Sequence, residues 1–136
     1  MPSILAVSDE PFELSDYWGT LTAAAYRLMK VSTPADALAV LRGDEELDIL
    51  VCDYHLGQHQ IDGLELVRQA NEIKHRQGIV AIVTTSHAPA DLQLQMHQLG
   101  KDGAHIILYD KNRGSHSVGE LIRELFEPQR VDDRNL

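Results

Sequence analysis

The run Ile49-Leu50-Val51-Cys52-Asp53 is continuously apolar until its last residue, which is an acid. A short apolar run of this kind is typical of a strand that is buried on both faces, as in a parallel sheet. The polar segment that follows extends to Gly63, and apolar residues then recur from Leu66 to Ile73 at the spacing of one helix face. The stretch therefore predicts a strand, a loop and a helix, which is one unit of an alternating α/β domain.

The same alternation continues in both directions along the chain. Short apolar runs predict further strands, and segments with helical periodicity lie between them and after the last. The predicted strands cover 4–7, 26–31, 79–83 and 104–108, and the predicted helices cover about 11–25, 34–42, 92–99 (closed by Gly100) and 118–125. Together these elements predict an α/β domain with a five-stranded parallel sheet and helices on both faces. We expect residues 1–126 to form this single domain and the polar residues 127–136 to fray.

The composition excludes several classes of protein. The formal net charge is -9, which disfavours direct binding of nucleic acid because phosphate backbones are repelled by an acidic surface. The apolar runs are too short to cross a bilayer, and the N-terminus lacks the pattern of a signal peptide, so we expect no membrane association. The chain has a single cysteine, Cys52, which rules out a disulfide framework and favours a cytoplasmic location. Strand alternation predicts that this cysteine packs in the core if Asp53 points to a site.

Polar clusters follow three of the predicted strands. They are Ser8-Asp9-Glu10, Asp53 and Thr84-Thr85-Ser86. Because the carboxyl ends of parallel strands share one edge of a sheet, we expect these clusters to meet there. Carboxylates that lie close together repel one another, and a hard divalent cation such as Mg²⁺ relieves that repulsion. A carboxylate beside Mg²⁺ can attack a phosphoryl group, and the Thr84 hydroxyl could donate a hydrogen bond to a phosphoryl oxygen.

Two segments resemble the phosphoacceptor region of CheY-like receiver domains of response regulators. They are Asp53-Tyr54-His55-Leu56-Gly57 and, after a short loop, Asp62-Gly63-Leu64-Glu65-Leu66. Ser8-Asp9-Glu10 looks like the acidic pair of that family, and Val83-Thr84 looks like its hydroxyl position. The resemblance extends over roughly residues 3–126 and implies a flavodoxin/CheY-like fold with strand order 2-1-3-4-5.

The resemblance also implies a role for each matching residue. Asp53 would accept a phosphoryl group from a histidine kinase or a histidine phosphotransfer protein, and Thr84 would sense that group. Asp9 would bind Mg²⁺ together with Asp53 and the backbone carbonyl of His55, and Glu10 could compensate in part for a missing acid. The protein would then be a signalling module rather than a turnover enzyme. Phosphorylation would switch a protein-binding surface for a downstream protein or for an output domain outside this sequence.

Several positions depart from the family pattern. Ser8 stands where the family has its first acid. Lys111 matches the family's lysine only if one residue is inserted, and Asp110 otherwise takes its place. Ile107 or Leu108 occupies the position of the aromatic switch residue. These departures support an alternative, a degenerate receiver that is never phosphorylated and serves as a protein-interaction scaffold. A flavodoxin-like binding or hydrolytic domain is a further alternative, although the acidic loop after the first strand would repel a phosphate.

Overall fold

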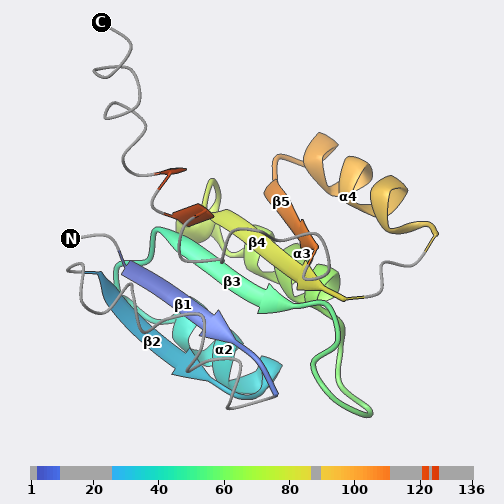
Figure 1. Cartoon of the computed structure of the whole chain (residues 1–136). Coiled ribbons are helices and arrows are strands. Elements are labelled where there is room, and N and C mark those ends of the chain that lie inside the picture. Colours follow the sequence, from blue (N-terminus) through green and yellow to red (C-terminus); the bar gives the residue numbers. More distant parts are fainter. Residues whose placement is uncertain (1–2, 10–25, 87–89, 111–120, 123, 126–136) are drawn as a thin grey trace, which may run out of the picture.

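The chain forms one parallel sheet of five strands in the order β2-β1-β3-β4-β5, as the computed structural model shows (Figure 1). The structure describes residues 3–9, 26–86, 90–110, 121–122 and 124–125. The predicted helix over 11–25 and the tail over 127–136 lie outside the described residues, as do Glu10 and Lys111. The predicted fold class and the strand order are confirmed.

The elements alternate along the chain as expected. The strands are β1 (Ser3–Val7), β2 (Arg27–Val31), β3 (Ile49–Asp53), β4 (Val80–Thr85) and β5 (His105–Asp110). The helices are α2 (Pro34–Arg42), α3 (Gly63–Glu72) and α4 (Leu92–Lys101), and a 3₁₀ turn η1 (Lys74–Arg76) follows α3.

Both β4 and β5 extend two residues beyond their predicted ends. The prediction stopped each strand where the apolar run stopped. In the structure, Thr84 pairs with Tyr109 and Thr85 with Asp110, so the ladder of paired residues continues through polar positions. This extension carries Thr84 and Thr85 to the carboxyl edge of the sheet as parts of a strand.

The end of α4 also differs from the prediction. Gly100 was expected to close this helix, but it lies inside α4, which continues to Lys101. The glycine that leaves the helical conformation is Gly103, with φ 99. The amide of Ala104 donates to the carbonyl of Leu99 at 3.1 Å, which closes the helix end. Left-handed φ, and not the presence of a glycine alone, marks the stop.

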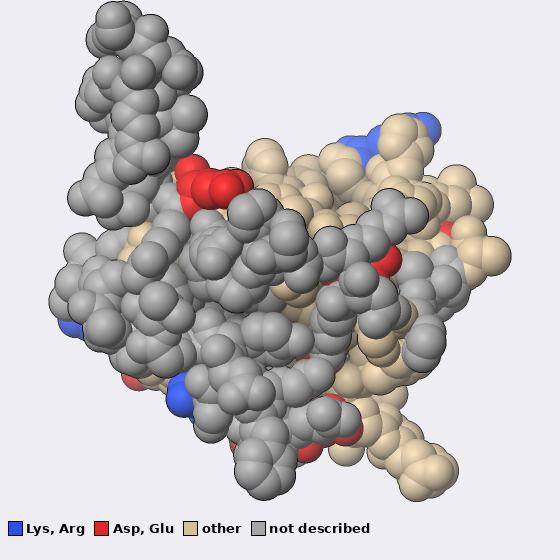
Figure 2. Space-filling model, viewed as in Figure 1, with Lys and Arg blue, Asp and Glu red and all other residues tan. Residues whose placement is uncertain are grey.

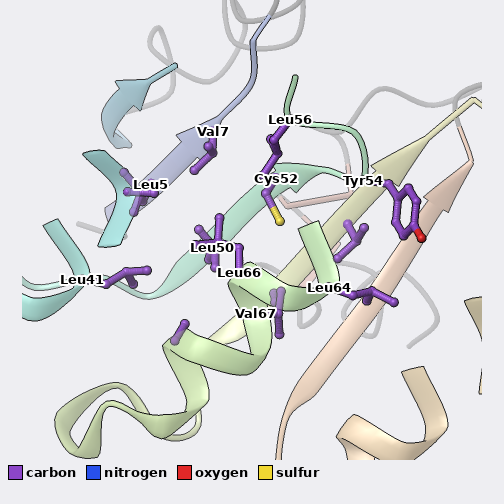
Figure 3. Close-up of a cluster of buried hydrophobic side chains, with 14 of the residues drawn as sticks. Leu5, Val7, Leu41, Leu50, Cys52, Tyr54, Leu56, Leu64, Leu66 and Val67 are labelled. Carbon is purple, nitrogen blue, oxygen red and sulfur yellow. The ribbon is translucent and has the colours of Figure 1, made fainter. Parts of the chain in front are cut away.

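Alternate residues of the buried strands face opposite layers of the molecule. Leu5, Leu50 and Cys52 belong to a core cluster that includes buried residues of α2, α3 and α4 (Figure 3). Ile4, Ile49 and Ile82 belong to a second cluster, which includes Ile122. Because residues 121–122 are helical, both faces of the sheet are covered by helical residues, as predicted.

A buried arginine closes the C-terminal end of α2. Arg76 is only 6% exposed. Its Nε donates to the carbonyl of Leu41 at 2.8 Å, and its Nη2 donates to the carbonyl of Gly43 at 3.0 Å. A cation there favours the negative end of the helix dipole and satisfies carbonyls that have no partner within the helix.

Candidate functional site at the carboxyl edge of the sheet

Asp53 is the last residue of the central strand β3. Its side chain is 8% exposed, and β3 lies between β1 and β4 in the sheet. The parallel register places Asp53 next to Thr84 on β4. The site is therefore formed where three neighbouring strands end, which is where open α/β sheets place their ligands.

Two hydroxyl groups hold the carboxylate of Asp53. The Ser8 Oγ donates to Asp53 Oδ2 at 2.7 Å, and the Thr84 Oγ1 donates to Asp53 Oδ1. Ser8 and Thr84 are themselves buried, at 3% and 2% exposure. A buried carboxylate is costly unless it is hydrogen-bonded, and here each of its oxygens accepts a hydrogen bond. The three strand ends thus meet as expected, but the bond from Ser8 was not anticipated, because its serine was interpreted only as the loss of an acid.

Asp9 lies beside the loop that follows β3. Its side chain is exposed, and its Oδ2 would be 3.7 Å from a Cβ placed on Gly57, whose φ is 112. Gly57 thus has a left-handed conformation that other residues adopt at a cost, and a Cβ placed there would be in ordinary van der Waals contact with Asp9. The exposed His55 lies in the same loop.

The residues expected to hold Mg²⁺ fit such an ion by their chemistry. The carboxylates of Asp9 and Asp53 and the carbonyl of His55 offer only oxygen, which hard divalent cations prefer. The described part of the chain contains no group of three or more His, Cys, Asp or Glu side chains that could hold a metal. A site here would therefore depend on the backbone carbonyl and on water as well as on the two carboxylates.

The carboxyl end of β5 contributes an acid and an aromatic residue. Asp110 ends the strand and lies opposite Thr85, and Tyr109 lies opposite Thr84. Tyr109 is half-buried against the second core cluster. An aromatic residue therefore lies next to Thr84. It comes directly after Ile107 and Leu108, the two residues that the resemblance placed at the position of the aromatic switch. Lys111, the expected phosphate-binding lysine, falls just beyond the described part of β5.

Tyr54 connects the site to the helices, a role that no pattern in the sequence indicated. Its amide donates to the carbonyl of Thr84 at 2.7 Å, and its carbonyl accepts from the amide of Gly63 at 2.8 Å. The residue is 9% exposed and belongs to the core cluster drawn in Figure 3. Burial raises the pKa of the Tyr54 phenol, and the carboxylates of Asp62 and Asp91 raise it further. One residue thus connects the ends of β3 and β4 with the start of α3.

The start of α3 lies directly against the site. Asp62 caps the helix by accepting a hydrogen bond from the amide of Glu65 at 2.8 Å. A side chain at Gly63 would overlap the carbonyl oxygen of Asp53. Only glycine allows the helix to begin this close to the strand, so the Asp62-Gly63 pair fixes the distance between α3 and Asp53.

Cys52 is a core residue and not part of the reactive edge. It is fully buried, and burial together with the nearby carboxylates of Asp53 and Asp62 raises the pKa of its thiol. The Sγ donates to the carbonyl of Gly63 at 3.7 Å. Because the thiolate is the reactive form, the thiol is suited to packing and not to nucleophilic or redox chemistry.

Charged side chains are dispersed over the surface. On the face in Figure 2, the described Asp and Glu side chains occupy separate places, and the described Lys and Arg side chains form no continuous basic area there. In the described parts of the chain, no helix has both the length and the apolar character needed to cross a membrane.

Comparison with known proteins gives a clear answer for the fold. No protein-family model matches the sequence, and no curated protein matches it. Solved structures do match. A CheY-like response regulator receiver domain protein from Methanospirillum hungatei has a TM-score of 0.71 at 20% identity, with 100% of this chain and 99% of that chain covered. The chemotaxis protein CheY4 of Vibrio cholerae has a TM-score of 0.73 at 20% identity, covering 96% and 98%. The signal receiver domain of an HD domain-containing protein from Pseudomonas fluorescens has a TM-score of 0.74 at 21% identity, covering 99% and 93%.

Proposed function

We propose that this chain, which has the CheY-like receiver-domain fold, is a signalling receiver that accepts a phosphoryl group on Asp53. The observation that carries the proposal is the position of Asp53 at the end of the central strand, between the hydroxyls of Ser8 and Thr84. A carboxylate held by hydrogen bonds at the carboxyl edge of a parallel sheet is fixed in orientation at the place where such sheets bind their ligands.

The reaction would be a phosphoryl transfer from a phosphohistidine. The bond between phosphorus and the imidazole nitrogen breaks, and a bond forms between phosphorus and one carboxylate oxygen of Asp53. The electron pair returns to the imidazole, which then takes up a proton. The Thr84 hydroxyl, which donates to Asp53 Oδ1, can donate to a phosphoryl oxygen once the acyl phosphate has formed. Mg²⁺ held by Asp9, Asp53 and the His55 carbonyl would neutralise the phosphoryl charge.

The proposal implies one partner that donates the phosphoryl group and another that receives the signal. The phosphoryl donor would be a histidine kinase or a histidine phosphotransfer protein in the cytoplasm. The signal would pass to a downstream protein or to an output domain outside this sequence. The chain would bind and respond rather than turn over a substrate, because the phosphoryl group remains on its own side chain.

A second function is favoured by one feature of the site. Both carboxylate oxygens of Asp53 already accept hydrogen bonds, and Ser8 replaces an acid that would help to bind the cation. A chain whose Asp53 carboxylate already has these hydrogen bonds could keep the fold without being phosphorylated and act as a protein-interaction scaffold. A test for phosphorylation of Asp53 distinguishes the two functions.

The test is mass spectrometry of the intact protein after incubation with acetyl phosphate and Mg²⁺. We expect the native chain to gain one phosphoryl group that hydroxylamine removes, and Asp53→Asn to gain none. Asp102→Asn, which changes an exposed acid after α4, is the matched control and should behave as the native chain. A gain that persists in Asp53→Asn would contradict the assignment. No gain in any variant, including with a phosphorylated histidine phosphotransfer protein, would favour the scaffold function.

A further inference from the structure

The hydrogen bond from Ser8 to Asp53 is the feature that distinguishes this site most clearly from a pair of acids. It joins residues 45 positions apart, at the ends of the neighbouring strands β1 and β3. Its length is 2.7 Å, and both residues are buried. A bond in such a place is shielded from water and is stronger than the same bond on the surface.

We propose that Ser8 is a regulatory residue of this site, whose hydroxyl holds Asp53 Oδ2 in the cation-free chain and competes with a divalent cation for that carboxylate. The inference rests on the proposed function in that it takes Asp53 as the carboxylate to which the cation binds. Ser8 would thereby set the concentration of Mg²⁺ at which the site becomes ready for phosphorylation.

The physical argument begins with the needs of a buried carboxylate. Asp53 must have partners for its two oxygens, and the Thr84 and Ser8 hydroxyls supply one each. A carboxylate at position 8 would repel Asp53 instead, and that repulsion would be relieved by a cation. The hydroxyl removes the repulsion, and with it a large part of the drive to bind a cation. It also donates to one of the two oxygens that Asp53 could offer to a cation.

The direction of the effect can be tested with Ser8→Ala, which removes the hydroxyl and adds no charge. Asp53 Oδ2 then loses this donor, and a cation can compensate for the loss. We expect the dissociation constant for Mg²⁺, measured by titration calorimetry, to fall roughly three- to tenfold, the equivalent of one hydrogen bond. Without Mg²⁺ the variant should melt at a lower temperature than the native chain, and saturating Mg²⁺ should raise its melting temperature by more.

Two further variants serve as controls. Ser8→Thr keeps a hydroxyl and should bind Mg²⁺ as the native chain does. Ile49→Val makes a small cavity at the opposite end of β3, in the second core cluster, and lowers stability without touching the site. It should leave the affinity for Mg²⁺ unchanged, which separates a direct effect at Asp53 from a general loss of stability.

The competing explanation is that Ser8 helps to hold the cation, directly or through water. In that case Ser8→Ala would bind Mg²⁺ more weakly, and either weaker or unchanged binding overturns the inference. If Ser8→Ala is unfolded without Mg²⁺, the dependence of its folding on the Mg²⁺ concentration gives the same dissociation constant by linkage. Failure to fold even at saturating Mg²⁺ would also count against the inference.

Failure of the proposed function would look different. Tighter Mg²⁺ binding by Ser8→Ala without phosphorylation of Asp53 in any variant would refute the phosphoacceptor function and support the role of Ser8. Phosphorylation of Asp53 with the same Mg²⁺ affinity in the native chain and in Ser8→Ala would do the reverse.

Discussion

At the level of single residues, consecutive positions at the end of β3 have opposite environments. Cys52 and Tyr54 belong to the core cluster that includes α2, α3 and α4, whereas Asp53 accepts hydrogen bonds from Ser8 and Thr84. The alternation of side chains along a strand places the acid between two core residues. The apolar neighbours fix the backbone, and the backbone in turn fixes the direction of the Asp53 carboxylate.

The phenol of Tyr54 should make stability depend on alkaline pH. Its pKa in the folded chain is raised by burial, by the Asp62 and Asp91 carboxylates and by a hydrogen bond with Asp62. The folded state therefore favours the neutral phenol, and this contribution to stability is complete below the unfolded pKa of about 10 and is lost as the pH rises above it. We expect urea unfolding to show a smaller loss of stability across this range in Tyr54→Phe than in the native chain.

A second variant tests the cause of that shift. Asp62→Asn retains a side chain that can cap α3 but removes one carboxylate near the ring. The pKa of Tyr54, followed by the ultraviolet absorbance of tyrosinate with Tyr54→Phe as the blank, should fall in this variant. An unchanged pKa would show that burial alone sets the shift.

The sequence predicted the residues of the site better than it predicted their contacts. Asp53, Ser8 and Thr84 could be brought together because each ends a strand of a parallel sheet. The hydrogen bond from Ser8 could not be predicted, because strand patterns place a residue at an edge without showing which atom it contacts. Tyr54 was missed for a similar reason, since a single aromatic residue after a strand has no periodicity. The hydrogen bonds of Asp53 and Thr84 are seen, but the roles assigned to these two residues stay predictions. The roles assigned to Asp9, Glu10, His55 and Lys111 also stay predictions.

At the level of elements, helix ends carry much of the local specificity. Asp62 caps α3 and Gly63 allows the close approach of α3 to Asp53. The helix thus begins at Gly63, before the apolar repeat from Leu66 by which it was predicted. Arg76, which closes α2, lies 35 residues along the chain from Leu41, whose carbonyl it binds. No local pattern links such distant positions, so this contact could only be found in three dimensions.

Gly100 is a weak point within α4. It is exposed, and no atom would lie within 4 Å of a Cβ placed there. Because alanine restricts the unfolded chain more than glycine does and fits the helix, Gly100→Ala should raise the free energy of unfolding by about 0.5–1 kcal/mol. Gly103→Ala is the matched comparison. Its φ of 99 strains any side chain, so it should lower the free energy of unfolding by about 1–2 kcal/mol in the same urea titration. Equal effects of the two variants would contradict this difference.

Arg76 should contribute more to the free energy of unfolding than a charged residue on the surface does. Arg76→Met keeps much of the apolar stem but removes the donors to the Leu41 and Gly43 carbonyls. We expect a loss of about 1.5–3 kcal/mol in the free energy of unfolding, typical of hydrogen bonds to a charged group. Arg42→Met, which changes an exposed arginine at the end of the same helix, should alter stability by no more than about 0.5 kcal/mol. Chemical denaturation followed by circular dichroism measures both, and similar small effects would show that the buried contacts are replaced by water.

At the level of the whole molecule, the site is connected to the helical layer by the backbone that surrounds it. The carbonyl of Thr84 accepts from Tyr54, whose own carbonyl accepts from Gly63 at the start of α3. The Tyr54 phenol also lies near Asp91, the residue before α4. We therefore expect a change in the hydrogen bonds of Thr84 to reach the starts of these two helices.

This arrangement predicts where the chain responds to a phosphoryl mimic. With beryllium fluoride and Mg²⁺ present, the largest change in amide hydrogen exchange should fall within Thr84–Ser86 and α4. β5 should change less, because Ile107 and Leu108 are smaller than an aromatic switch residue and carry no hydroxyl, so their packing should differ less between the two states. Asp53→Asn is the control and should show no response. A response confined to β5, with α4 unchanged, would instead point to Tyr109 beside Thr84 as the moving residue.

The strand order also has a consequence for folding during synthesis at the ribosome. β3 lies between β1, which precedes it in the chain, and β4, which follows it, and all three pair in parallel. The central strand of the sheet thus leaves the exit tunnel with only one of its two partners already synthesised. Until β4 follows, the nascent chain exposes an unpaired strand edge of the kind that recruits chaperones or aggregates. A translational pause between β3 and β4, while α3 is synthesised, would therefore prolong the exposure of this edge.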